Sequence, residues 1–421
     1  MKVLHTAGRD GTRAQALIAQ LECRRNTVDE RAVPVARRIL EGMRKGGDAA
    51  LRGYATRFDR ISEQTPLRIS EDEIKQAWRE VSPAFRAAVQ TAAKNIRRFA
   101  QRQMPKDWSF EPVAGLKVGQ QVRPLESVGC YVPSGRYPLP STMLMTVIPA
   151  QVAGVKRIVV VSPRPAPETL AVAGFLGIKE FYCIGGAQAV AALAYGTESI
   201  ARVDKIVGPG NAYVTAAKKL VSFDCAIDML AGPTEIVVTS ETGYPECIAA
   251  DLVAQSEHDP DTVAVFITTQ TALAENVSAE VERRVSKNSI AREAIRRSGI
   301  IFVTKTVAEA RGITNRLAPE HLTVDAESDL EWVMHAGSVF IGRYSAQPMG
   351  DYISGPNHTL PTGGLARVRG GLSVSDFFKI ITIQKYRQQG MKRLGASAIV
   401  LAEAEGLQGH AEAIRVRGGH A

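Results

Sequence analysis

The sequence predicts an α/β fold with two parallel-sheet domains, a helical N-terminal segment and a helical C-terminal tail. Between about residues 125 and 340, short apolar runs alternate with helix-forming stretches. This alternation is the pattern of parallel sheets covered by helices. Hydrophobic residues make up 45% of the 421-residue chain and charged residues 23%, as in globular proteins. The length fits two or three domains of roughly 100–200 residues each.

The elements follow from the spacing of apolar residues. Residues 25–105 are expected to form one helix after another, because apolar positions recur about every 3.6 residues in ERAVPVARRILEGMRK and SPAFRAAVQTAAKNIRRFAQR. Buried strands are expected at VGCYV, RIVVVSP, EFYCIGG, KIVGPG, TEIVVTSE, VAVFITT, IIFVTK and SVFIG. Helices are expected between strands at PSTMLMTVIPAQVAG, ETLAVAGFLGI, AQAVAALAYGTESI, NAYVTAAKKLVSF and PECIAADLVAQSEH. After about residue 375 a separate helical piece is expected, SDFFKIITIQKYRQQGMKRLG and then SAIVLAEAEGLQGHAEAIRVR.

The net charge of +9 allows nucleic acid or an anionic small molecule as partner. Basic residues are scattered among acidic ones, as in RRNTVDERAVPVARRILEGMRK (24–45), and no basic run is interleaved with aromatic residues. This distribution argues against nucleic acid and favours an anionic cofactor or substrate.

Composition also bears on the compartment. No segment approaches the ~20 apolar residues of a membrane span, and the N-terminus MKVLHTAGRDGTRAQ lacks the apolar run of a signal peptide. We therefore expect no membrane association and a cytoplasmic protein. The five cysteines are widely spaced without a C-x-x-C pair, so neither a disulfide framework nor a thiolate zinc site is indicated.

The stretch LVAQSEHDPD (252–261) carries polar side chains on an otherwise apolar helix. Asp251, Gln255 and His258 are spaced i, i+4 and i+7 in a helix expected over 246–258, so they share one face. The Gln255 amide oxygen and a His258 imidazole nitrogen can both coordinate a metal ion. The alternative is a set of hydrogen-bonded surface residues.

The motif RLAPEHLTV (316–324) contains two adjacent groups, Glu320 and His321, that can move protons near neutral pH. Pro319 before them can begin a helix. The alternative is an exposed charged pair at a helix start.

Two further motifs combine an acidic residue with a histidine. In MGDYISGPNHTLPTGG (349–364), Asp351 and His358 lie in a Gly- and Pro-rich loop of the kind that positions functional groups. This pair is compatible with metal binding without being specific for it. In AEAEGLQGHAEAIRVR, Glu405 and His410 lie in an Ala-rich amphipathic helix pair, for which a plain helix surface is the alternative.

Two Gly-rich turns, GGAQA (185–189) and VGPGNAYV (207–214), each join an expected strand to an expected helix. Such a turn before a helix N-terminus suits a phosphate or a dinucleotide. Neither turn matches G-x-G-x-x-G or the P-loop pattern, so the expected domains are Rossmann-like nucleotide-binding folds lacking the G-x-G-x-x-G fingerprint. The residues alone indicate a metal-assisted enzyme with a nucleotide-like cofactor.

Eight motifs, in order and with matching spacing, resemble the histidinol dehydrogenase family: VGCYVPSGRYPLPST, GGAQAVAALAYGTE, VGPGNAYVTAAK, DMLAGPTEIVV, DLVAQSEHDPD, LAPEHL, GDYISGPNHTLPTGG and EGLQGHAEAIRVR. The resemblance extends from about residue 25 to residue 417. It implies a zinc enzyme that oxidises L-histidinol through L-histidinaldehyde to L-histidine with two NAD+, the last steps of histidine biosynthesis. The alternative is a zinc- and NAD-dependent paralogue acting on another polar alcohol, such as a sulfonated diol. A third possibility is a non-catalytic basic binding protein that keeps the fold.

The resemblance also implies roles for single residues. The implied zinc ligands, one ion per subunit, are Gln255, His258, Asp351 and His410, and Mn2+ also suits such a site. His321 would take the hydroxyl proton, and Glu320 would activate water on the aldehyde. The implied substrate contacts are Thr234, Gln255, His258, His321, Asp351, His358, Glu405 and His410. The implied cofactor contacts are Tyr131, Gln188 and Asn211.

The family resemblance implies a homodimer in which Glu405 and His410 of the tail reach the partner's site. The expected domains are an N-terminal helical extension (1–24), a discontinuous main α/β domain with the zinc and substrate site (25–128 and 234–374), an inserted cofactor-side domain (129–233) and a helical tail swapped between subunits (375–421).

Three positions depart from the family's usual pattern. Thr234 stands where serine is usual and keeps the hydroxyl. Gln347 stands where many members have glutamate, which removes a charge near the substrate loop. Ser134 replaces the first glycine of the usual Pro-Gly-Gly.

Overall fold

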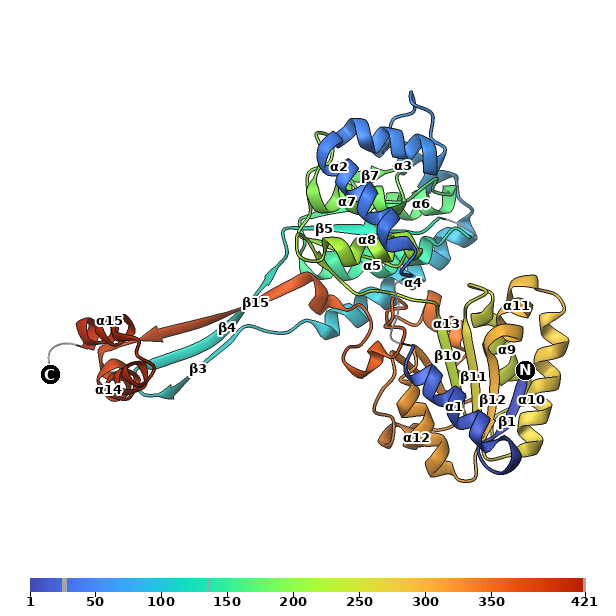
Figure 1. The fold of residues 1–421 in the computed structure, drawn as a ribbon. Helices are drawn as coiled ribbons and strands as arrows, with labels where there is room; N and C mark the ends of the chain where they lie inside the picture. Colours follow the sequence, from blue (N-terminus) through green and yellow to red (C-terminus); the bar gives the residue numbers. More distant parts are fainter. Residues whose placement is uncertain (25–28, 135–136, 419–421) are drawn as a thin grey trace.

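The computed structural model describes residues 1–24, 29–134 and 137–418, which form two α/β lobes and a long arm (Figure 1). In the first lobe, a six-stranded parallel sheet has the order β1–β12–β11–β10–β13–β14. Its strands are β1 (Lys2–His5), β10 (Glu235–Thr239), β11 (Val263–Thr268), β12 (Gly299–Val303), β13 (His321–Val324) and β14 (Ser338–Ile341).

Helices cover both faces of this first sheet. One face packs against α9 (Pro245–Ser256), α10 (Thr271–Val285) and α11 (Ser289–Ser298), and the other against α1 (Gly11–Glu22) and α12 (Val307–Leu317). Helix α13 (Gln347–Tyr352) lies against α9. Because both faces of the sheet are covered, its inner strands β11 and β12 consist almost entirely of buried apolar residues.

The second lobe contains a sheet with the order β2–β7–β6–β5–β8–β9, parallel except for the edge strand β2. Its strands are β2 (Arg68–Ile69), β5 (Ser127–Tyr131), β6 (Arg157–Val161), β7 (Glu180–Tyr182), β8 (Lys205–Val207) and β9 (Ala226–Ile227). One core contains α2 (Ala32–Tyr54), α7 (Gly186–Tyr195) and α8 (Ala212–Val221). The other contains α3 (Glu71–Glu80), α4 (Pro83–Gln103), α5 (Pro140–Ala153) and α6 (Pro167–Leu176).

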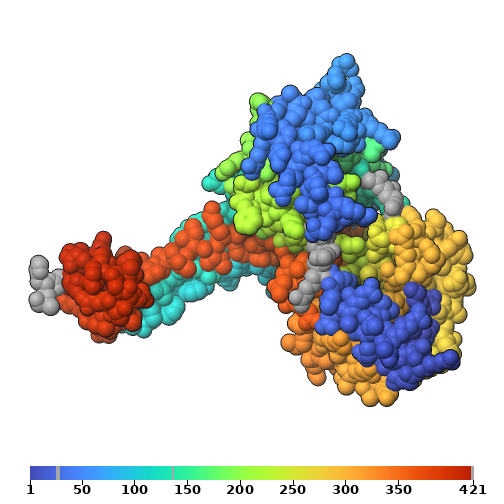
Figure 2. Space-filling model, viewed as in Figure 1, coloured from blue at the N-terminus to red at the C-terminus, as the bar shows by residue number. Residues whose placement is uncertain are grey.

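The arm is a three-stranded antiparallel sheet that ends in two helices and stands clear of both lobes (Figure 2). It consists of β3 (Trp108–Val113), β4 (Leu116–Pro124), β15 (Phe378–Tyr386), α14 (Gln388–Ala404) and α15 (Gln408–Gly418). Large apolar side chains are exposed along it, including Trp108, Phe110, Ile380, Leu401 and Val416. Such a run of exposed apolar surface is typical of a site that meets another protein surface.

Short helical turns complete the fold: the 3-10 turns Gly8–Asp10, Glu327–Glu331, Leu365–Arg367 and Val374–Phe377, and the π turn Ala55–Asp59. Among the described residues, none of the helices has the length and apolar character needed to cross a membrane.

The predicted α/β class is confirmed, and all eight predicted strands are present. The predicted helix within 24–45 is present as α2, although residues 25–28 lie outside the described part of the chain. The prediction of a wholly helical tail is wrong, because residues 378–386 form β15. Their sequence, FKIITIQKY, is rich in β-branched residues and pairs along its whole length with β4.

The grouping of elements also differs from the expected domains. Residues 1–24 contribute β1 and α1 to the first lobe. Within 25–128, helices α2, α3 and α4 pack on the second sheet, whereas β3 and β4 form the arm. An amphipathic pattern shows that a helix has an apolar face, but it does not show which sheet will cover that face.

Candidate active site

The candidate active site is a cavity of about 650 Å³ lined by residues of both lobes. Strands β10 and β13 are parallel neighbours, which brings Thr234 just before β10 close to Glu320 just before β13. Across the cavity lies the turn after β8, including Asn211. Open α/β sheets normally bind ligands at the carboxyl ends of their strands. The second sheet follows this rule, whereas the first presents the amino ends of β10 and β13.

A directed chain of hydrogen bonds connects three predicted site residues. The Gln255 side-chain amide, near the end of α9, donates to the Thr234 hydroxyl, which donates to Glu320 Oε2 over 2.6 Å. The Glu235 backbone N–H donates to the same carboxylate oxygen over 2.8 Å. An ionised carboxylate only accepts, so Thr234 uses its one proton on Glu320 and accepts from Gln255. This order fixes the orientation of the Gln255 amide.

The fixed orientation leaves the Gln255 amide oxygen buried without a hydrogen-bond partner among the described residues. Gln347 Oε1 is likewise buried without a hydrogen-bond partner among the described residues. The Gln347 Nε2 group donates to Asp351 Oδ2 over 3.1 Å. An unpartnered buried polar atom costs about 1–3 kcal/mol. The Asp351 carboxylate and the His258 imidazole line the same cavity as Gln255, so an amide oxygen, a carboxylate and an imidazole are available to a ligand or an ion.

His321 is a buried, neutral imidazole. Its Nδ1 lies 3.1 Å from the Glu235 carbonyl oxygen, which only accepts, so Nδ1 carries the proton and Nε2 has the lone pair. Burial lowers the pKa of His321 to about 4. Nε2 lies 3.9 Å from Asp351 Oδ1. The ring is therefore able to accept a proton at Nε2 near neutral pH.

Glu320 is 6% exposed and adjoins His321, with 3.6 Å between Glu320 Oε2 and His321 Nδ1. Burial raises the pKa of Glu320 well above its usual value, and the nearby Glu235 and Asp351 charges act in the same direction. The bonds from Thr234 and the Glu235 N–H oppose this effect. A carboxylate with a raised pKa is a stronger base.

The loop that carries Asp351 and His358 is folded back on itself. His358 Nδ1 donates to the Asp351 backbone carbonyl over 2.8 Å, and its Nε2 lies 3.4 Å from the Thr142 hydroxyl. Burial raises the pKa of Asp351 to about 7 and lowers that of His358 to about 4. His258 lies two residues beyond the end of α9 at Ser256. Burial lowers the pKa of this histidine as well.

The expected cofactor residues lie at the carboxyl ends of the second sheet, but they do not all face the cavity. Asn211 lines it and caps α8 by accepting from the Tyr213 and Val214 backbone N–H groups. Tyr131 and Gln188 are buried: the Tyr131 hydroxyl accepts from the Gly186 N–H, and Gln188 donates to Asp59.

Sequence reasoning missed two buried carboxylates. Asp59 accepts from the Gly185 N–H over 3.1 Å and from Gln188 Nε2 over 3.0 Å, yet no motif distinguishes it. Glu235 accepts two hydrogen bonds from the Arg24 guanidinium and one from the Gly363 N–H. It did carry a signal, since it is the one charged residue in the buried strand EIVVT.

The structure does not bring Glu405 and His410 to this site. Both are exposed where α14 and α15 meet, at the tip of the arm (Figure 1). Across the parts of the chain that the structure describes, no group of three or more His, Cys, Asp or Glu side chains is placed to hold a metal ion.

The helix expected to begin at Pro319 is absent, and this prediction is wrong. Helix α12 ends at Leu317, Ala318 has a left-handed φ of 46°, and β13 begins at His321. The segment HLTV forms a strand because β10 and β14 pair with it on both sides.

We expect Thr234→Val to lower kcat/KM by roughly tenfold to a hundredfold, because a hydrogen bond to a charged group contributes about 1.5–3 kcal/mol. The change removes the link between Gln255 and Glu320 at nearly constant volume. Steady-state kinetics of Thr234→Val and Thr234→Ser measure this effect. The serine variant keeps the hydroxyl and should stay within about threefold of the parent, and equal losses in both variants would contradict a role for the hydroxyl.

Two doubly wound sheets share this cavity, which is lined by a buried acid–base pair of the first lobe and by the Gly-rich turn after β8 of the second. These are the features of an α/β enzyme with a nucleotide-type binding turn. The sequence profile of the histidinol dehydrogenase family matches residues 22–418. The chain belongs to this family.

Individual relatives agree. The chain is 45% identical to histidinol dehydrogenase from Bacillus cereus, over 93% of this chain and 94% of the relative. It is also 45% identical to that from Methanothermobacter thermautotrophicus, over 94% and 96%. The crystal structure of histidinol dehydrogenase from Elizabethkingia anophelis superposes with a TM-score of 0.92 at 37% identity, covering 99% of this chain and 98% of that one.

Proposed function

We propose that this protein oxidises L-histidinol through L-histidinaldehyde to L-histidine with two NAD+, the last steps of histidine biosynthesis. The observation that carries the proposal is the buried Glu320–His321 pair, which faces a cavity lined by the residues that the family motifs single out. The family match over residues 22–418 supports the same reaction. The cytoplasmic location stays a prediction.

We further propose one zinc ion per subunit, held by Gln255, His258 and Asp351 together with His410 of a second copy. The donor set supports this: Gln255 Oε1 is buried and unpartnered among the described residues, and the Asp351 carboxylate has a pKa raised by burial that an added cation would offset. Two oxygen and two imidazole ligands suit a site that must also accept substrate donors. When bound, zinc would orient the imidazole and the amine of the substrate.

For the cofactor, we propose NAD+ along the turn that ends at Asn211, with Tyr131 and Gln188 shaping the neighbouring GGAQ turn. Asn211 lines the cavity, and the other two residues hold or adjoin the Gly185–Gly186 backbone. When bound, the nicotinamide would accept the hydride.

The chain itself moves the protons. As the C–H bond of the alcohol carbon breaks, His321 Nε2 takes the hydroxyl proton of the alcohol. The His321 ring can accept this proton because it is neutral. Glu320 then takes a proton from the water that adds to the aldehyde carbon. Thr234 and the Glu235 N–H hold the Glu320 carboxylate in place for this step. The resulting diol would lose its hydride to the second NAD+ and one hydroxyl proton to His321 Nε2, once that nitrogen has released its first proton to solvent. The acid formed in this way ionises to the carboxylate product.

We propose a homodimer in which each arm delivers Glu405 and His410 to the partner's cavity. The exposed apolar residues of the arm support an intermolecular role, as does the position of both residues at its tip. A second cavity of about 710 Å³, mainly apolar, shares His258 and Asp351 with the site. An apolar segment of the partner's tail, such as the one around Leu407, would bind in this cavity.

The direct test is to incubate the purified, zinc-loaded protein with L-histidinol and NAD+ and to follow NADH. We expect two NADH per histidinol consumed. A parallel panel of sulfonated diols tests the paralogue alternative. NADH formation from a diol but not from histidinol would overturn the proposed substrate, and salt-sensitive nucleic-acid binding without any NADH formation would overturn the enzymatic role.

Removal of the metal should abolish histidinol oxidation, and added Zn2+ should restore it, because the substrate then regains its orienting ion. We expect His410→Ala to hold less than one zinc per subunit, as measured by elemental analysis. His335→Ala is the control, because it replaces a half-buried histidine of the first lobe that does not line the cavity. Full zinc occupancy in His410→Ala would refute its assignment as a ligand.

A further inference from the structure

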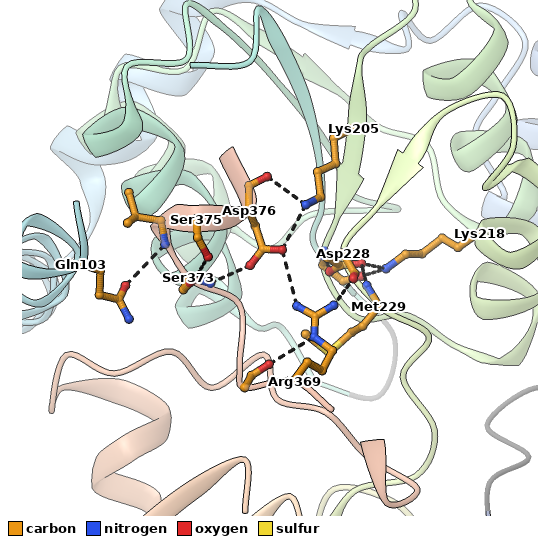
Figure 3. A network of polar contacts seen from close by, with 12 residues as sticks. Gln103, Lys205, Lys218, Asp228, Met229, Arg369, Ser373, Ser375 and Asp376 are labelled. Atoms are coloured by element: carbon orange, nitrogen blue, oxygen red, sulfur yellow. Dashed lines mark hydrogen bonds and ion pairs between the residues drawn. The ribbon is translucent and has the colours of Figure 1, made fainter. Parts of the chain in front are cut away.

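Lys218 on α8 and Asp228 after β9 form a buried ion pair (Figure 3). The pair lies beside the candidate cofactor turn, because both side chains bond to Gly208. The two side chains are 3% and 0% exposed. Both residues belong to the motifs VGPGNAYVTAAK and DMLAGPTEIVV, yet the proposed reaction gives neither of them a role.

The pair holds both backbone polar groups of one glycine. Lys218 Nζ donates to the Gly208 carbonyl over 2.9 Å, and Asp228 Oδ2 accepts from the Gly208 N–H over 2.8 Å. Gly208 has a φ of 110°, and a Cβ there would collide with the Tyr131 carbonyl oxygen. The ion pair thus fixes a backbone conformation that is largely restricted to glycine.

Gly208 begins the turn whose other end, Asn211, lines the active-site cavity and caps α8. Lys218 lies on that same helix, and its side chain bonds back to Gly208, the first residue after β8. This bond connects the helix that follows the turn to the residue that begins it. Gly208 and Asn211 are therefore held to the same helix, Gly208 by the Lys218 side chain and Asn211 as its N-cap.

The pair also anchors the segment that crosses from the second sheet to the first. Asp228 Oδ1 accepts from the Met229 N–H over 2.6 Å, and Thr215 donates to the Ala231 carbonyl over 3.1 Å. This segment leads directly to Thr234. Arg369 donates to the Asp228 carbonyl and pairs with Asp376, which also binds Lys205, so the network continues to the base of the arm (Figure 3).

A buried ion pair is often no more stabilising than an apolar pair of similar volume. Stability alone therefore does not account for charged groups at these two positions, whereas the two backbone bonds to Gly208 require a donor and an acceptor. We propose that Lys218 and Asp228 are positioning residues that hold the Gly208–Asn211 turn in the geometry that binds the cofactor. This inference rests on the proposed function, which places NAD+ at that turn.

The test uses the double variant Lys218→Met/Asp228→Asn in the full-length, zinc-loaded enzyme. It leaves no uncompensated buried charge and keeps one acceptor oxygen, which can serve the Gly208 N–H, but it removes the donor to the Gly208 carbonyl and the acceptor of the Met229 N–H. We expect KM for NAD+ to rise roughly tenfold or more while kcat at saturating NAD+ stays within about threefold. The zinc content and KM for histidinol should be unchanged.

A matched control is Arg157→Met/Glu180→Gln, which removes an ion pair between β6 and β7 of the same lobe. It should leave KM for NAD+ unchanged. If the Lys218–Asp228 pair were merely structural, its double variant would lower the melting temperature or the active fraction without changing KM for NAD+, and that result would overturn the inference. The variant Asn211→Ala tests the proposed cofactor turn separately from the role of the ion pair. An unchanged KM for NAD+ in Asn211→Ala would refute the cofactor turn itself.

Discussion

Glu320→Gln is expected to reduce the overall rate of histidinol oxidation by roughly 10²–10⁴-fold, the usual contribution of a positioned general base. Glutamine keeps an oxygen that can accept from Thr234 and from the Glu235 N–H, so the local geometry should persist. It cannot take a proton from water. The loss should therefore fall on aldehyde oxidation rather than on the first hydride transfer.

Single-turnover measurements separate the two half-reactions. NADH formation is followed from L-histidinol and, separately, from L-histidinaldehyde. A suitable control is Glu241→Gln, which neutralises a carboxylate beyond the opposite end of β10. Equal losses in both half-reactions would show that Glu320 is not the group that activates water.

Mixing two inactive variants, Glu320→Gln and His410→Ala, should restore activity if the arm completes the partner's site. In a mixed dimer, one of the two sites then combines an intact Glu320 with an intact His410. Random exchange of equal amounts gives one-half mixed dimers, hence about a quarter of the parent activity. The measurement requires subunit exchange by co-expression or by refolding together.

The outcome discriminates sharply. If His410 acted within its own chain, both sites of every mixed dimer would lack one group, and the mixture would stay as inactive as its components. A mixture of Glu320→Gln with His321→Ala is the matched control. Both of those changes lie in one chain's own cavity, so either arrangement leaves that mixture inactive.

Most of the elements could be predicted because their signals are local. The runs IVVV in β6 and IVV in β10 are apolar and largely buried. The tail strand β15 could not be predicted in the same way. Its residues are mostly exposed in this chain, and its structure depends on pairing with β4, more than two hundred residues earlier in the sequence.

The site shows the same division. The sequence by itself determined the chemical groups: an amide and an imidazole in LVAQSEH, an acid–base pair in PEH, and two Gly-rich turns before helices. It also determined the family, because eight motifs occur in order.

Only the tertiary structure decided how these groups meet. It turned the Gln255 amide oxygen away from Thr234, buried Tyr131 and Gln188, and placed His410 in α15, the helix at the end of the arm. It also joined Lys218 to Asp228 around Gly208. The physical reason is that strand and helix patterns depend on neighbours within a few residues, whereas hydrogen-bond direction, burial and ion pairing depend on contacts between segments that the chain brings together only when it folds.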